Sequence, residues 1–278
     1  MNPKLQRRVQ RYGWDLAAEE YEPLWQRQLA DARSALFSAA SVAAGERVLD
    51  VACGTGLVAL DAARIVGAEG RVVGVDLAGK MVAAARARAA VLGLSNVTFQ
   101  RMDAQKLELP DASFDVVLCA LGLMYVPDPV AALSEMRRIL RPGGRMVAAV
   151  WGERSHCGWA PLFEIVDSEV SSEVCPLFFH LGQPDVLAEL CMKMHLDVFE
   201  HQRLSSTLGY VDADEACDAA FVGGPVALAW SRFAEDVRQR VRRRYLSAIA
   251  PWSQGSGYRI PGEFVIVAAK NPLRFNSA

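Results

Sequence analysis

The stretch VLDVACGTGLVAL, residues 48–60, carries the strongest structural signal in this chain of 278 residues. Its apolar beginning predicts a buried strand and its end predicts a helix, with a glycine-rich turn between the two. Gly54, Gly56 and Ala59 satisfy the spacing G-x-G-x-x-G/A, and Asp76 ends the next predicted strand 20 residues after Gly56. A turn of this kind at the start of a helix predicts a ligand site, for a dinucleotide or for another cofactor.

Short β-branched segments alternate with helical patterns from residue 45 to residue 151, which predicts a parallel sheet covered by helices. Seven strands are expected, at residues 46–52, 70–76, 96–103, 113–121, 145–151, 195–207 and 263–270. We therefore expect an α/β fold of the Rossmann-like kind, with a mostly parallel seven-stranded sheet and helices on both faces.

The segments outside this core are predicted to be largely helical. Residues 230–249 form an amphipathic pattern that predicts one helix, with Val237, Val241 and Tyr245 on its buried side. The expected divisions are an N-terminal helical cap (residues 1–44), a cofactor-binding core (45–151), a helical insertion in the substrate cap (152–196), and C-terminal strands and a helix that complete the sheet (197–278).

The composition indicates an ordinary folded protein, with 52% hydrophobic residues and a net charge of −2. This charge does not favour nucleic acid, and no apolar run reaches the roughly 20 residues of a membrane span. We therefore expect a cytoplasmic protein. The six cysteines form no CxxC pair and no zinc-type spacing, so they are expected to be reduced and structural, without a metal. The basic run at residues 237–245 is interpreted as a solvated helix face, with an anionic acceptor or an acidic carrier protein as alternatives.

Asp50 separates the candidate ligands of the glycine turn. It lies at the tip of the first predicted strand, four positions before Gly54. A dinucleotide would bring its pyrophosphate to this helix N-terminus, where a carboxylate would repel it. S-adenosylmethionine instead carries an ammonium and a sulfonium, both of which a carboxylate favours. The turn therefore favours S-adenosylmethionine.

Several segments together resemble a known family. VLDVACGTG is similar to the first motif of the class I S-adenosylmethionine-dependent methyltransferases, and GVDLAGKMVAAARARA (residues 74–89) resembles their second strand and helix. Residues 119–151 resemble the branch that includes the quinone-biosynthesis C-methyltransferases and many small-molecule O-methyltransferases. The resemblance covers residues 45–151 well and the flanking segments weakly.

This resemblance implies S-adenosylmethionine as the cofactor and S-adenosylhomocysteine as the product. It implies that Asp76 binds the ribose hydroxyls, that Asp103 accepts from the adenine amino group, and that the Ala120 carbonyl faces the ammonium. For Leu77 and Met81, a place in the adenine pocket and a place in the core both remain open. The full expected cofactor set is Tyr21, Asp50, Ala52, Gly54, Gly56, Asp76, Leu77, Met81, Asp103, Ala104 and Ala120.

Methyl transfer from a sulfonium is an in-line displacement, so orientation of the acceptor supplies much of the acceleration. A general base is needed only where the acceptor loses a proton. Tyr125, His156 and His180 are the candidate catalytic residues, although an ordinary surface or hydrogen-bonded loop residue is the commoner explanation for such a histidine. Many relatives carry a histidine where this chain has Met124 and Tyr125, which favours a pocket that mainly orients its acceptor.

Aromatic residues indicate which chemical class of acceptor molecule the site would bind. Trp14, Trp25 and Trp151, with Met124 and Tyr125, are expected to line an apolar pocket, although the tryptophans would also serve as core. We therefore expect methyl transfer to O or C of a small aromatic or apolar molecule. An N- or S-directed methyltransferase, a non-catalytic protein with the cofactor fold and a nucleotide-dependent oxidoreductase are the alternatives. The oligomeric state stays open, a homodimer included.

Overall fold

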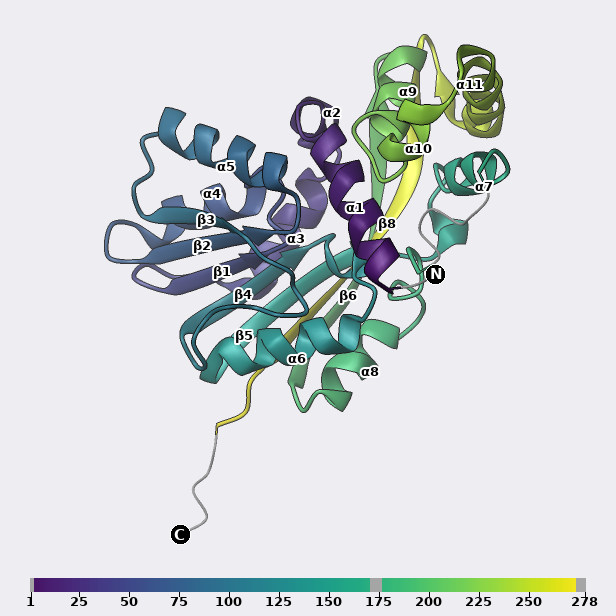
Figure 1. The fold of residues 1–278 in the computed structure, drawn as a ribbon. Coiled ribbons are helices and arrows are strands. Elements are labelled where there is room, and N and C mark those ends of the chain that lie inside the picture. The colour runs from purple at the N-terminus through teal and green to yellow at the C-terminus, as the bar shows by residue number, and fades with distance from the viewer. Residues whose placement is uncertain (1–2, 171–176, 274–278) are drawn as a thin grey trace.

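The computed structural model describes residues 3–170 and 177–273. Its sheet has the strand order β3-β2-β1-β4-β5-β8-β6, and the short β7 pairs with β8 (Figure 1). The strands are β1 (Arg47–Val51), β2 (Arg71–Asp76), β3 (Val97–Arg101), β4 (Phe114–Ala120), β5 (Leu140–Trp151), β6 (Asp197–Tyr210), β7 (Ser253–Gln254) and β8 (Gly257–Lys270). The predicted fold class is confirmed, and the one strand beyond the seven expected is the two-residue β7.

The sheet is parallel from β3 through β5, and β8 runs antiparallel to both β5 and β6. The connections through α4 (Leu57–Val66) and α5 (Gly79–Val91) progress from β1 toward β3, whereas α6 (Pro129–Ile139) leads the other way, from β4 to β5. Because such crossovers are right-handed, α6 covers the opposite face of the sheet from α4 and α5. The order reverses between β1 and β4, where open α/β sheets bind ligands.

The central strands are buried on both faces, which explains their nearly continuous apolar sequences. In β5 and β8, Val147 pairs with Ala268, and Ala149 pairs with Ile266, and all four residues are fully buried. A single large apolar cluster extends from these strands into the surrounding helices. The sheet is thus a rigid platform for whatever its carboxyl edge holds.

The N-terminal segment forms the predicted helical structure, as α1 (Pro3–Ala17), α2 (Tyr21–Trp25) and α3 (Ala30–Ala40). α3 packs on β4, β5 and β8. Figure 1 shows α1 (dark purple) between α5 on one side and α9 and α10 on the other, and α1 contacts both α5 and α10. α1 therefore bridges the core and the C-terminal helices.

The C-terminal half supplies the other helices. They are α7 (Pro161–Asp167), α8 (Val186–Lys193), α9 (Ala213–Phe221), α10 (Ala227–Arg232) and α11 (Glu235–Ile249). The prediction of one helix over residues 230–249 is wrong, because the backbone of Phe233 and Ala234 is extended between α10 and α11. Trp230 stacks on Phe221 of α9 with a centroid separation of 4.4 Å, which holds α10 in place before α11 begins.

The basic run lies on α11, whose Val241 and Tyr245 are buried whereas Val237 is partly exposed. Arg240 forms an ion pair with Glu169, 2.7 Å away, and Arg242 forms one with Asp214. Arg240 is exposed and Arg242 is half-buried, and both tie α11 to its neighbours. Within the described ranges, none of the helices combines the length and the apolar composition that a bilayer crossing requires.

Candidate functional site

A cavity lies at the carboxyl ends of β1, β2 and β4, beneath the N-terminal helices. Of the residues expected at the cofactor, this cavity is lined by Tyr21, Ala52, Gly54, Asp76, Leu77, Met81, Asp103, Ala104 and Ala120. A smaller adjoining cavity shares Tyr21, Ala52, Gly54 and Ala120 with it and adds Asp50. The structure thus gathers at one site residues that are spread over a hundred positions of sequence.

The two glycines of the turn have different surroundings. Both adopt the left-handed conformation, with φ of 54° at Gly54 and 85° at Gly56, which glycine allows without strain. A Cβ at Gly54 would meet only the Tyr21 ring, at 3.9 Å, so this backbone is open to the cavity. A Cβ at Gly56 would lie 3.1 Å from Phe99. Gly56 therefore packs the turn against β3, and it does not line either cavity.

Asp76 is fixed at the end of β2 by the backbone around it. Its Oδ2 accepts a hydrogen bond of 2.9 Å from the Gly54 N–H, and its Oδ1 accepts one of 2.8 Å from the Ala78 N–H. Burial raises the pKa of this carboxyl above its usual value despite the two bonds. Each oxygen keeps a lone pair for a ligand hydroxyl, which fits the ribose of a nucleoside.

Asp50 is almost completely buried, with 1% of its surface exposed, and its Oδ2 has no hydrogen-bond partner. Burial, followed by the charge of Asp76, raises the pKa of Asp50 well above its usual value. Arg33 of α3, to which sequence reasoning did not point, lines the same smaller cavity. A carboxylate and a guanidinium that line one cavity would complement the ammonium and carboxylate of an amino acid, such as the methionine part of the cofactor.

Asp103, which follows β3, also lines the large cavity. Its Oδ1 accepts a hydrogen bond of 3.0 Å from the Gln105 N–H, and its Oδ2 lies 3.6 Å from Nε of Arg7 on α1. Arg7 also lines the cavity. α1 therefore reaches over the site and pairs with a residue of the core.

The tips of β1 and β4 meet closely beside the cavity. Ala52 and Leu121 line it in the left-handed conformation, with φ of 56° and 59°. That conformation costs about 1–2 kcal/mol for a residue with a Cβ. A Cβ on the neighbouring Gly122 would lie 2.4 Å from Cβ of Ala52. The site thus requires a glycine at position 122, which sequence reasoning did not identify.

The opposite end of the cavity is aromatic. The residues expected at the acceptor, Trp14, Trp25, Met124, Tyr125 and Trp151, all line it. Trp14 packs edge-on against Tyr125 at 5.1 Å between ring centroids, and Trp25 packs in the same way against Trp151 at 6.2 Å. Further aromatic lining residues, not expected from the sequence, are Trp159, Phe178, Tyr210 and Tyr245. The cofactor end and this aromatic end form one continuous cavity.

Comparisons with known proteins agree with this geometry. A family model for a methyltransferase domain matches residues 43–180. The ubiquinone/menaquinone biosynthesis C-methyltransferase UbiE of Bdellovibrio bacteriovorus is 35% identical over 189 residues, which cover 64% of this chain and 78% of that protein. The chain belongs to the UbiE-like S-adenosylmethionine-dependent methyltransferases.

Other relatives of this methyltransferase align over shorter stretches. The UbiE protein of Cellvibrio japonicus is 37% identical over 134 residues, 48% of this chain and 51% of that protein. Aklanonic acid methyltransferase DauC of Streptomyces sp. strain C5 is 42% identical over 102 residues, 37% of this chain and 46% of that protein. A methyltransferase structure from Bacillus halodurans shares the fold, with a TM-score of 0.62 and 20% identity over 86% of this chain and 98% of its own.

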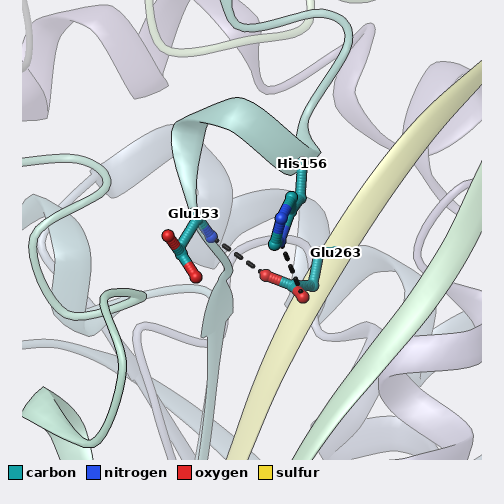
Figure 2. Close-up of side chains that lie close together, drawn as sticks. All are labelled: Glu153, His156 and Glu263. Carbon is teal, nitrogen blue, oxygen red and sulfur yellow. Dashed lines mark hydrogen bonds and ion pairs between the residues drawn. The ribbon is translucent and has the colours of Figure 1, made fainter.

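Neither candidate histidine lines the methyltransferase cavity. Figure 2 shows His156 turned toward Glu263, and its Nδ1 lies 3.0 Å from Oε1 of that residue. His180 is exposed, beyond the buried Phe178 and Phe179. Of the three residues expected to be catalytic, only Tyr125 is part of the cavity wall.

The group around His156 also resembles a metal site in composition. Glu153, His156 and Glu263 bring their ligand atoms within 4.8 Å of one another (Figure 2). However, the guanidinium of Arg203 already pairs with both carboxylates, 2.5 Å from Oε2 of Glu263 and 3.3 Å from Oε1 of Glu153. We interpret the group as an ion-pair network that joins the end of β5 to β6 and β8.

The cysteines that the structure describes are in environments that make a thiol unreactive. The five described cysteines are all buried and free, and Cys175 lies outside the described residues. Burial raises the pKa of the Cys119, Cys157, Cys191 and Cys217 thiols to about 12. These four thiols are therefore protonated and act as small apolar side chains.

Proposed function

We propose that this protein transfers the methyl group of S-adenosylmethionine to an O or C atom of a small aromatic or apolar acceptor. The observation that carries the proposal is that a single cavity is lined by Gly54, Asp76 and Asp103 and also by the aromatic side chains of Trp25, Tyr125 and Trp151. An acceptor held at the aromatic end would lie beside the cofactor, with water largely displaced.

The bound cofactor supplies an activated methyl group, and the protein's residues supply position. Asp76 and Asp103 would hold the nucleoside end, while Asp50 and the backbone at Gly54 would hold the methionine end. Tyr125 would orient the acceptor, because its ring is itself held between Trp14, at 5.1 Å, and Phe178, at 5.4 Å. In this proposal, proximity and alignment provide most of the acceleration.

The distribution of charge favours O or C over N as the reacting atom. Among the described residues, the carboxylates that line the large cavity are Asp76 and Asp103, both at the cofactor end. An alkylammonium acceptor would therefore find no counter-charge at the aromatic end. Neutral phenols and enolisable ketones need none.

Release of S-adenosylhomocysteine tests the proposal. The protein is incubated with S-adenosylmethionine and a panel of bicyclic phenols, 1,3-diketones and amines, with His156→Ala as the matched control variant. We expect turnover of phenols or diketones, unchanged in the control, since His156 does not line the cavity. Methylation of the amines alone, or no turnover of any compound by a protein that binds the product, would overturn the proposal.

A further inference from the structure

Arg88 of α5 contacts two parts of the cofactor site that lie far apart in the sequence. Its Nη1 donates a hydrogen bond of 2.9 Å to the carbonyl oxygen of Thr55, which lies between Gly54 and Gly56 in the turn. Its Nη2 lies 2.5 Å from Oε1 of Glu22 on α2. A planar guanidinium can bind two groups at once in this way, because its N–H donors have a fixed geometry.

The bond to Thr55 holds the part of the turn that the cavities do not reach. Thr55 is buried and lines neither of the two cavities, whereas Gly54 lines both. Asp76 already holds the N–H of Gly54, at 2.9 Å. The turn is therefore fixed by Asp76 at its start and by Arg88 at its end. Because the Arg88 donor is charged, its bond is stronger than one between neutral groups.

The ion pair with Glu22 holds α2, the short helix that covers the turn. α2 has five residues and begins and ends with Tyr21 and Trp25, both of which line the large cavity. A helix of this length is unstable by itself, so its position depends on contacts with the rest of the fold. Among the described residues, the pair of Glu22 with Arg88 is the one ion pair that α2 forms.

We infer that Arg88 is a positioning residue that couples α2 to the glycine turn, so that the cover and the turn adopt their cofactor-binding arrangement together. A Cβ on Gly54 would lie 3.9 Å from the ring of Tyr21, so α2 adjoins the open backbone of the turn. Arg88 links these two segments from outside, since it lines neither cavity. The inference rests on the methyl donor of the proposed function and needs no assumption about the acceptor.

A second arginine makes the same kinds of contact away from the cofactor and supplies the matched control. Arg145 of β5 lies 2.8 Å from Oε1 of Glu46 and donates a hydrogen bond of 2.8 Å to the carbonyl oxygen of Ser41. It pairs with Val116 near the start of β4, and it lines neither cavity. Loss of Arg145 should therefore lower stability without changing cofactor affinity.

A double-mutant cycle tests the coupling. The affinity for S-adenosylhomocysteine is measured by calorimetry, and the free energy of unfolding is measured in urea for the same proteins. We expect affinity to fall at least about tenfold in Arg88→Met and about three- to fivefold in Glu22→Ala. The double variant should lie within about twofold of Arg88→Met, because Glu22 acts through Arg88.

The control variants should keep the wild-type affinity. Arg145→Met removes an arginine of matched contacts, and we expect it to be less stable but to bind S-adenosylhomocysteine as the wild-type protein does. Glu19→Ala removes an exposed carboxylate close to Glu22 in the sequence, and Glu19 forms no ion pair among the described residues. It should therefore change neither stability nor affinity.

Two further measurements distinguish positioning from a purely structural role. In Glu22→Ala without ligand, we expect amide exchange across residues 53–57 to accelerate, because Arg88 is then less firmly held. In turnover assays, the KM for S-adenosylmethionine should rise in the Glu22 and Arg88 variants while kcat changes less than about twofold. Both expectations follow from residues that line neither cavity.

Losses that multiply in the double variant would overturn the inference, as would an Arg88→Met protein that is less stable but binds normally. If Arg88→Met folds poorly, Glu22→Ala still decides the question, because unchanged affinity together with unchanged exchange of the turn would contradict the coupling. Failure of the wild-type protein to bind S-adenosylhomocysteine would instead contradict the proposed function.

Discussion

At the scale of single residues, the buried carboxylate of Asp50 lowers the stability of the fold when no ligand is bound. Its raised pKa means that the folded, unliganded protein holds this proton more tightly than the unfolded chain does. The carboxylate therefore destabilises the unliganded fold as the pH rises above the unfolded-state pKa of about 3.9. A bound ammonium would reverse this effect, because it favours the ionised form.

The variant Asp50→Asn should consequently be more stable than the wild-type protein but bind the ligand more weakly. We expect the unliganded variant to melt about 2–5 °C higher at pH 7, and its affinity for S-adenosylhomocysteine to fall at least about tenfold. For the wild-type protein, affinity should also fall as the pH is lowered through the raised pKa of Asp50. Thermal melting and calorimetry check both effects, with the exposed Asp197→Asn as control. A variant that is less stable and binds normally would contradict this account of Asp50.

Gly122 offers a second test at the same scale. Gly122→Ala would place a Cβ 2.4 Å from Cβ of Ala52 and 3.0 Å from Sγ of Cys119, so the tips of β1 and β4 would have to separate. We expect a loss of about 1–3 kcal/mol in the free energy of unfolding, measured in urea, together with weaker S-adenosylhomocysteine binding. Gly209→Ala is the control, since its Cβ would meet nothing within 4 Å. Equal stability of the two variants would contradict the close-contact explanation.

Some of these site residues could be identified from the sequence, and others could not. Asp50, Gly54 and Asp76 stand at strand ends and in a glycine turn, where position along the chain reveals position in space. Gly122 and Arg33 matter because of what lies opposite them, Ala52 and the smaller cavity, and no local pattern encodes those neighbours. Residues of this second kind become visible only in three dimensions.

At the scale of elements, α1 and α2 form a cover over the cavity, which Trp14 and Tyr21 line. α1 is held to the core by the ion pair of Arg7 with Asp103, at 3.6 Å, and α2 by that of Glu22 with Arg88, at 2.5 Å. Helices at the periphery of a fold open more readily than the central strands of a sheet. A bound nucleoside would add contacts to both helices.

Hydrogen exchange should report this closure directly. With saturating S-adenosylhomocysteine, we expect amide exchange across α1 and α2 to slow at least about tenfold, because opening would then also break contacts with the ligand. Exchange in most of α11 should stay unchanged and serves as the internal reference, since only Tyr245 of that helix lines the cavity. Equal slowing in α1, α2 and α11 would indicate a general stabilisation and would contradict the role of a cover.

The elements themselves were predictable where periodicity was strong. The strands of the core coincide with apolar runs, and glycine and proline residues mark the ends of the helices. The order of these elements along the chain was therefore predicted correctly. The single helix expected over residues 230–249 was wrong because the pattern stays amphipathic through Phe233, while the stacking of Trp230 on Phe221 requires a break there. Tertiary packing decided that boundary.

At the scale of the whole molecule, one cavity is lined by residues of local sequence motifs and by aromatic residues from distant segments. Trp25, Trp159, Tyr210 and Tyr245 come from four elements or loops spread along the chain. The resemblance to methyltransferases covers the first group and becomes weak at the second. This explains why the cofactor could be predicted from the sequence, whereas the part of the wall formed by Trp159, Phe178, Tyr210 and Tyr245 could not.

The central claim is that the cavity at the ends of β1, β2 and β4 binds the methyl donor through Asp76. Calorimetric titration of the purified protein with S-adenosylhomocysteine tests it most directly, with Asp76→Ala measured beside the wild-type chain. We expect one site per chain in the wild-type protein and a loss of affinity of at least about thirtyfold in the variant, because two hydroxyl contacts lose their acceptor. Absence of binding to the wild-type protein, or equal affinity in a correctly folded variant, would contradict the claim.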